Sequence, residues 1–312
     1  PALVPWMMSK NRRFKENREK VARLNQDRMQ AAAALTLPIL EKLDLTVISE
    51  YEHEDGFMGE PGVSYLLRTD QGSLLYDIGF GAQGKTFSNN TARLGLTMED
   101  VDGLAISHLH ADHMGGLKAQ RKGQVSLPPE FGAAGGKPCT LPGEAQAEGF
   151  DVRIAEGPEI LEGGIASTGP LARSMYFFGL TEEQALVAHL KGKGLFVLTG
   201  CGHPTIETVI RMVRRLSDEP IYAIGGGLHF PVTEGRGNYG GFQIQMILGT
   251  GKPWWERVTD EDLTDTIEAI RAEKPKRVLL SAHDTCDHAL RRISQEVDAE
   301  VEILKAGATY VL

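Results

Sequence analysis

The sequence predicts an α/β fold in which sheets pack against each other beneath covering helices. Short apolar β-type runs broken by glycines recur in two blocks of the chain, and segments with helical spacing of apolar residues accompany both blocks. Of the 312 residues, 41% are hydrophobic and 24% are charged, which is enough apolar material for a large core. No low-complexity linker divides the chain, so we expect one main domain.

The expected elements follow in chain order. Lys10–Arg28 carries apolar residues at helical spacing on a charged background, which predicts an amphipathic helix within an N-terminal helical extension of residues 1–43. This helix either packs on the main domain, residues 44–312, or forms an arm. Such an arm would contact an anionic surface, or it would contact a second copy of the chain and so support a homo-oligomer. The β-type runs are residues 45–51, 63–68, 73–78, 101–107, 152–155, 195–199, 220–226, 277–282, 301–305 and 308–312.

Three further helices and two loops are expected between these strands. Thr181 and Gln184 form a capping-box pattern that predicts a helix over 181–190. Pro204 suits the first turn of a helix over 203–216, and a threonine followed by three acids opens another over 259–272. Residues 122–149 are rich in proline and glycine and predict a loop. The segment 231–257 is either a substrate lid or a surface loop held by two tryptophans.

Charge and cysteine content restrict the function. The 33 basic and 42 acidic residues give a net charge of −9, which disfavours a nucleic-acid surface and favours a small-molecule substrate. Three cysteines without a CxxC pair support neither a disulfide framework nor a cysteine zinc knuckle. No apolar run reaches the roughly 18 residues that cross a bilayer. Residues 9–15 faintly resemble a twin-arginine signal, but a charged stretch follows, so we expect a cytoplasmic protein without excluding export.

The most specific feature is the motif His108-x-His110-x-Asp112-His113. Two alternating histidines at a strand end point the same way and can share one metal ion, while Asp112 and His113 in the following turn can bind a second. Imidazole and carboxylate ligands suit Zn²⁺, Mn²⁺ or Fe²⁺. The motif therefore predicts a metal centre, with a surface histidine cluster as the alternative.

The motif resembles that of the metallo-β-lactamase superfamily, which implies a four-layer αβ/βα sandwich with a metal site at the edge of two sheets. The run SLLYDIG over residues 73–79 resembles that family's early strand, in which Asp77 braces the histidine loop. Downstream, TGCGHP over 199–204, GGGLH over 225–229 and SAHDTC over 281–286 resemble the 7,8-dihydropterin-6-methyl-4-(β-D-ribofuranosyl)aminobenzene-5′-phosphate synthase-like branch. The resemblance covers residues 45–312.

The other histidines are candidates of unequal strength. His203 and His283 follow predicted strands and are expected as further metal ligands, with a helix cap as the alternative for His203. His229 follows three glycines at a strand end and is expected to contact metal or substrate as a catalytic residue. The superfamily's bridging aspartate is replaced by Cys201, which is either a thiolate ligand or a small packed residue. Two ions are expected rather than one. His53, His189 and His288 do not follow predicted strands in this way and are expected to lie outside the site, with His189 within a helix.

These residues predict a hydrolase in which a metal-bound hydroxide attacks a small ester, lactone, amide or phosphoester. Asp112 would coordinate metal and orient the nucleophile. A phosphodiesterase or nuclease of the same fold is the alternative, and the acidic charge counts against it. A non-catalytic metal-binding or redox protein is a further alternative. It is disfavoured because diiron redox relatives usually carry glutamate at the position of His110 and a flavin domain.

Overall fold

The computed structural model describes residues 3–239, 242–243 and 245–312. Within this part of the chain, the first large sheet has eight strands. Its strands are β10 (Glu159–Ile160), β11 (Ala166–Ser167), β14 (Leu186–Leu190), β15 (Gly194–Thr199), β16 (Ile221–Gly226), β19 (Arg277–Leu280) and β20 (Glu300–Ile303), with β1 (Ile39–Leu40) paired to β14. The strands from β15 to β20 are parallel, so their carboxyl ends lie at one edge.

The second large sheet has seven strands in the described residues. They run in the order β21 (Thr309–Val311), β2 (Leu43–Ser49), β3 (Ser64–Thr69), β4 (Gly72–Tyr76), β5 (Gly103–Ala105), β7 (Pro138–Leu141) and β9 (Asp151–Ile154). The half from β4 to β9 is parallel. Small two-stranded sheets join β6 (Gln124–Val125) to β8 (Gln146–Ala147), β12 (Leu171–Met175) to β13 (Gly179–Glu183), and β17 (Asn238–Tyr239) to β18 (Phe242–Gln243).

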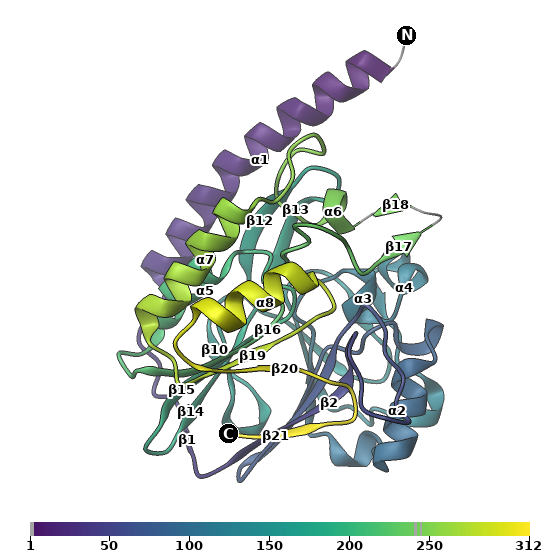
Figure 1. Ribbon diagram of the computed structural model, residues 1–312. Helices are drawn as coiled ribbons and strands as arrows, with labels where there is room; N and C mark the ends of the chain where they lie inside the picture. The colour runs from purple at the N-terminus through teal and green to yellow at the C-terminus, as the bar shows by residue number, and fades with distance from the viewer. Residues whose placement is uncertain (1–2, 240–241, 244) are drawn as a thin grey trace.

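The two sheets pack face to face, and helices cover both outer faces (Figure 1). Buried side chains such as Tyr65, Tyr76 and Phe196 fill the space between the sheets. The eight-stranded sheet is covered by α5 (Ile206–Leu216), α7 (Asp260–Glu273) and α8 (Asp287–Glu296); the seven-stranded sheet is covered by α2 (Thr86–Leu94), α3 (Ala111–Met114) and α4 (Leu117–Lys122). This arrangement confirms the predicted four-layer αβ/βα sandwich.

Local sequence accounts for the covering helices. Helix α5 buries Ile206, Val209 and Val213 on one face, as the apolar spacing predicts, although it begins three residues after His203. Thr259 is the N-cap of helix α7: its side chain accepts a hydrogen bond from the Asp262 backbone, and the Asp262 side chain accepts one from the Thr259 backbone in return. The short helix α6 (Gln245–Leu248) lies in the long segment before α7.

The predicted N-terminal helix is α1 (Leu3–Ala31), and it packs along β12, β13 and α5. Its Asn25 side chain exchanges two hydrogen bonds with the Ala172 backbone, at 2.7 and 2.9 Å. The first turns of α1, with exposed Trp6 and Met8, extend past the body of the molecule (Figure 1). The division at residue 43 stays a prediction, as does a homo-oligomer through this helix.

Among the described helices, none combines the length and apolarity that a membrane span requires.

Two local predictions are wrong. The helix predicted over 181–190 is instead the end of β13 followed by the strand β14. The side chains from Leu186 to Ala188 are all buried in the sheet, and long-range pairing of β14 with β15 overrides the local capping pattern. His189 therefore lies in a strand. The supposed loop over 122–149 contains three strands, of which β7 starts at Pro138, where proline's missing N–H is tolerated, and pairs with β5.

Candidate metal centre

The predicted site residues follow five strands that end at the same edge of the two sheets. Asp77 follows β4, and the histidine motif follows β5. On the other sheet, Cys201 follows β15, His229 follows β16 and His283 follows β19. Because the strands concerned in each sheet are parallel, their carboxyl ends converge, which is where open α/β sheets place ligand sites.

A buried carboxylate braces the histidine motif. Asp77 accepts hydrogen bonds from the Ser107 backbone N–H and hydroxyl, both at 2.6 Å, and its Oδ2 lies 2.7 Å from Nδ1 of His113. Since the Ser107 hydroxyl donates to Asp77, it accepts from Nδ1 of His108 at 2.9 Å. This network leaves Nε2 of His108 and His113 facing the centre, and it agrees with the predicted bracing role of Asp77.

The backbone carrying Cys201 and His203 is held by Glu183, at the end of β13. One carboxylate oxygen accepts from the backbone N–H groups of residues 200, 201 and 202 at 2.8–3.1 Å, and the other accepts from that of His203 at 2.8 Å. Gly200 permits this loop to approach the histidine motif, because a Cβ there would collide with the side chain of Ser107. Sequence reasoning missed Glu183, since it placed this residue in a helix.

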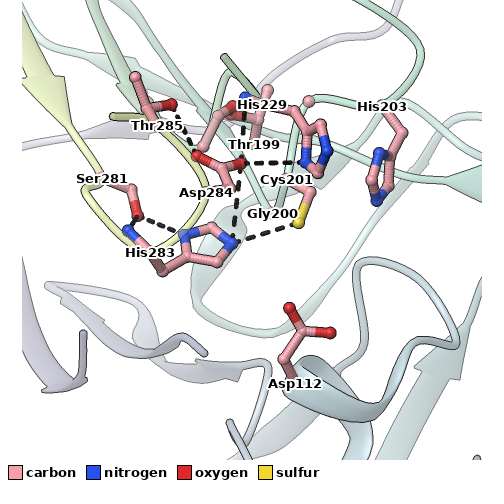
Figure 2. A network of polar contacts seen from close by, with 12 residues as sticks. Asp112, Thr199, Gly200, Cys201, His203, His229, Ser281, His283, Asp284 and Thr285 are labelled. Atoms are coloured by element: carbon pink, nitrogen blue, oxygen red, sulfur yellow. Dashed lines mark hydrogen bonds and ion pairs between the residues drawn. The ribbon is translucent and has the colours of Figure 1, made fainter. Parts of the chain in front are cut away.

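A second buried carboxylate orients His283. Ser281 donates to Glu50 at 2.5 Å, and its oxygen lies 2.5 Å from Nδ1 of His283. Glu50 also accepts from the Tyr65 hydroxyl at 3.0 Å. With Nδ1 bonded to serine, Nε2 of His283 faces Sγ of Cys201 at 3.2 Å (Figure 2). Glu50 was missed, although an acid at the end of a predicted apolar strand was a usable signal.

Asp284 is a further buried acid at the centre that was not predicted as a site residue. Its Oδ2 accepts from the His229 backbone at 3.1 Å and lies 3.7 Å from Nε2 of His283, while Oδ1 accepts from the Thr285 hydroxyl (Figure 2). The residue lies inside the quoted run SAHDTC, next to a predicted ligand, which was the available signal. His229 itself has a backbone φ of 57°, a strained value for a residue other than glycine.

Cys201 lies at the centre of the donor atoms. Three groups of residues could each hold an ion, because the potential ligand atoms inside each group all lie within 4.8 Å of one another. Each group contains the Cys201 thiol: Asp112, His113, Cys201 and His283; His108, Cys201 and His203; Cys201, His229 and Asp284. The first two sets each combine residues from both sheets. Ligands that share one ion at about 2.0–2.3 Å lie roughly 3–4 Å apart, so this packing is compatible with ion binding.

The unpartnered atoms also fit a metal. Among the described residues, Nε2 of His108 and both ring nitrogens of His203 and His229 are buried without a hydrogen-bond partner. Buried polar atoms normally have partners, so these nitrogens are free to bind a ligand that proteins commonly hold with imidazole. His110 lies beside them, with ring centroids 4.5 Å from His108 and 5.0 Å from His203.

The electrostatics favour lone pairs on most of the imidazoles. Burial lowers the pKa of His110 and of His229 to about 3 and holds that of His108 and His203 well below the usual range. Burial would also lower the pKa of His113, but the Asp77 and Asp112 carboxylates outweigh it and raise the value to about 9. A metal at Nε2 of His113 therefore has to displace a proton.

The acidic donors show the opposite shift. Burial, with nearby carboxylates, holds the pKa of the Cys201 thiol well above its usual range. Burial likewise raises the pKa of Asp112 and Asp284. A cation beside these groups would favour their ionised forms, because opposite charge offsets the cost of burying an anion.

The centre opens on a cavity of about 180 Å³ with a largely apolar wall. Phe80, Leu117 and Phe178 line it together with His110 and His203. Leu248 and Gly249, from the long segment 231–257, also line it, so this segment covers the centre instead of lying away from it. Its role as a movable lid stays a prediction.

The structure brings together all the residues predicted for the site, although their roles stay predictions. The set consists of His108, His110, Asp112, His113, Cys201, His203, His229 and His283. The histidines predicted to lie outside it have other neighbours: His53 bridges to Ala306, His189 lies 4.0 Å from Glu219, and His288 bonds Asp260 at 2.6 Å.

Known proteins show similarity to this chain in sequence and structure. The family model described as Metallo-beta-lactamase superfamily matches residues 58–122, which include the histidine motif. The 7,8-dihydropterin-6-methyl-4-(beta-D-ribofuranosyl)-aminobenzene-5'-phosphate synthase of Methanocaldococcus jannaschii is 23% identical, over 59% of this chain and 76% of that protein.

Two solved structures share the fold. Tm1679, described as a metal-dependent hydrolase of the beta-lactamase superfamily, is 20% identical with a TM-score of 0.62, covering 86% of this chain and 98% of its own. The metallo-beta-lactamase fold protein YhfI from Bacillus subtilis is 14% identical with a TM-score of 0.51, covering 87% and 100%. The chain thus has the metallo-β-lactamase fold, and its predicted resemblance to that superfamily and to the dihydropterin synthase-like branch is confirmed.

Proposed function

We propose that this protein is a metal-dependent hydrolase of a small ester, lactone, amide or phosphoester. The observation that supports this most strongly is the convergence of unpartnered buried imidazole nitrogens around one thiol and two carboxylates, next to a cavity. Imidazole, carboxylate and thiolate together suit Zn²⁺ better than Mn²⁺ or Fe²⁺, and the separate donor sets favour two ions.

The residues divide into two ligand sets under this proposal. His108 and His203, with His110 beside them, would hold one ion, and Asp112, His113 and His283 would hold the other. Cys201 belongs to both sets, so its thiolate would take the place that the superfamily usually gives to a bridging aspartate. When bound, such ions lower the pKa of water towards neutrality and polarise a carbonyl or phosphoryl oxygen.

Asp112 and His229 would act on the reactants directly. Asp112 is partly exposed to the cavity, where its carboxylate can orient a water molecule and accept its proton. His229 lines the same cavity with both ring nitrogens free of hydrogen bonds, so it can contact a substrate heteroatom.

The test is turnover of a panel of chromogenic esters, lactones and phosphodiesters, combined with measurement of metal content. We expect the His110→Ala variant to lose bound metal and at least about a thousandfold in kcat/KM, because removing a metal-site group removes both orientation and charge stabilisation. His189→Ala is the matched control, since that histidine lies on β14 outside the centre. Turnover that persists in His110→Ala would contradict the proposal.

A bond-forming reaction at the same centre is the second candidate, because the archaeal relative is named a synthase. Reaction in ¹⁸O-labelled water distinguishes the two. Hydrolysis places the label in the product, whereas transfer to another acceptor does not.

A further inference from the structure

A second cavity, of about 360 Å³, adjoins the metal centre on the side of helix α5. His203 and His229 form one wall, and the first turn of α5 lies next to them. Arg173, from the middle of β12, and the loop 249–252 also line it. A group bound here would therefore lie beside the metal ligands without occupying their place.

Arg173 carries the unexplained charge of this cavity. The neighbouring residues of β12 are buried, and Arg173 itself is only partly exposed. Among the described residues, its guanidinium has neither a hydrogen bond nor an ion pair. Burial lowers the pKa of Arg173, and its charge in turn helps to lower the pKa of His229, as expected for two groups on one cavity.

The loop 249–252 holds both groups closely. A Cβ at Gly251 would collide with the Arg173 guanidinium, and one at Gly249 would collide with the ring of His229. Gly251 also has a φ of 65°, in the left-handed region that favours glycine. The backbone of this loop thus fixes the guanidinium and the imidazole on the same cavity wall.

Glu207 and Asp262 lie close enough to favour the charged form of Arg173, but neither forms an ion pair or hydrogen bond with its guanidinium. Glu207 accepts a hydrogen bond from the Thr266 hydroxyl at 2.8 Å, and Asp262 pairs with Lys252 at 2.5 Å. Asp265 is exposed at the rim. The guanidinium of Arg173 is therefore left without a hydrogen-bonding anion, although Glu207 and Asp265 also contribute negative charge to the cavity lining.

Two further arginines lie beyond Arg173. Arg173 and Lys252 also line an adjoining cavity of about 630 Å³ between α1, β12 and α5, where Arg18 and Arg211 contribute their side chains and Glu256 is the one acid. Neither Arg18 nor Arg211 is in an ion pair with a described residue. This is a basic region on a chain of net charge −9.

We propose that Arg173 binds a phosphate group of the substrate in the cavity beside His203 and His229. The inference rests on the proposed function, because it places the bond to be broken at the metal centre and the phosphate on the side of α5. The guanidinium offers paired donors to a phosphate, and the N-terminus of the eleven-residue helix α5 adds a positive dipole end. The nearby positive charge of Arg18 and Arg211 favours a doubly charged anion over a carboxylate.

Calorimetric titration with inorganic phosphate tests the binding site directly. In protein freed of metal by chelation, we expect Arg173→Gln to raise the Kd for phosphate at least tenfold and Arg173→Lys to raise it less. Arg153→Gln, an exposed arginine on β9, is the matched control and should leave the Kd unchanged. Acetate should bind more weakly than phosphate. Equal Kd values in wild type and Arg173→Gln, or acetate binding as tightly as phosphate, would overturn the proposal.

A kinetic comparison separates this inference from the proposed function. With the metal-loaded protein and paired esters that differ only by a phosphate group, Arg173→Gln should raise KM at least tenfold more for the phosphorylated ester than for the neutral ester. Arg173-dependent phosphate binding without any turnover would support the phosphate site and refute the hydrolase. Turnover in which Arg173→Gln affects both esters alike would refute the phosphate site and leave the hydrolase standing.

Discussion

The two halves of the centre are built in different ways. The histidine motif is local: His108, His110, Asp112 and His113 lie within six consecutive residues after one strand. The opposite half is dispersed: Cys201 and His283 are 82 positions apart in the sequence and follow different strands, yet their donor atoms lie 3.2 Å apart. A short motif thus meets a surface that exists only in the folded chain.

The bracing of the halves differs as well. Asp77 orients His113 directly and His108 through Ser107, by contacts of 2.6–2.9 Å. In the dispersed half, Glu183 holds backbone N–H groups and Glu50 acts on His283 through a serine. The two mixed donor sets that would hold the ions draw residues from both halves, so neither half holds those ions alone. Both halves therefore depend on buried carboxylates outside the ligand segments, and Glu50 is the most distant of these, 231 positions from Ser281.

Removing the Glu183 carboxylate should have the largest effect on the dispersed half. In Glu183→Leu, four backbone N–H groups lose their acceptor, and we expect the free energy of unfolding to fall by about 3–5 kcal/mol. Metal content should fall with it, because the backbone of Cys201 and His203 loses its support. Chemical denaturation and metal analysis measure the two effects.

The neighbouring acid supplies the control. Glu182 lies on the same strand, and its ion pair with Arg28 is partly exposed, so Glu182→Leu should cost less than about 1 kcal/mol. Equal losses in the two variants would show that Glu183 has no special role.

The Glu50 carboxyl should make stability depend on pH. Burial raises its pKa from 4.5 to about 7, so the folded state keeps a proton that the unfolded state has already lost. Stability contributed by this group is present below pH 4.5 and falls by about 3 kcal/mol as the pH rises to 7. In metal-free protein, Glu50→Gln should flatten this decline, measured as unfolding free energy from pH 4.5 to 7.5. Exposed Glu54 gives the control Glu54→Gln, and a decline that stays parallel to the wild type in Glu50→Gln would contradict the assignment.

A smaller effect is expected where the two halves touch. In Gly200→Ala, the added methyl group meets the Ser107 side chain, which Asp77 holds in place, so we expect a loss of about 1–3 kcal/mol. Gly157→Ala is the control because a Cβ there has open space. If thermal unfolding shows no difference between the variants, the halves are less tightly fitted than the structure indicates.

The local half was predictable from the sequence because its chemistry is contained in adjacent residues. The strands that carry the dispersed half were also predictable, since the runs over residues 195–199 and 277–282 have continuously apolar centres, LFVL and VLL. His203, His229 and His283 could be named because each follows such a run. The fold class followed from these runs and from the resemblance.

Unlike Asp77, which the resemblance indicated, Glu183 and Glu50 were not predicted as braces, because their roles depend on contacts between separate segments of the chain. Glu183 lies in a segment whose local pattern favours a helix, and only pairing of β12 with β13 and of β14 with β15 places it in a strand. Arg173 has no motif around it, and its importance appears only when the loop 249–252 closes on its guanidinium. The central place of Cys201 likewise required the meeting of both sheets.

The central claim is that the two halves form one metal centre around Cys201. Anomalous scattering from crystals of the metal-loaded protein, recorded at the metal's absorption edge, tests it most directly. We expect two peaks flanking the Cys201 sulfur, one beside His108 and His203 and the other beside Asp112, His113 and His283. Peaks that are absent, that lie outside this cluster, or that leave Cys201 without metal contact would contradict it.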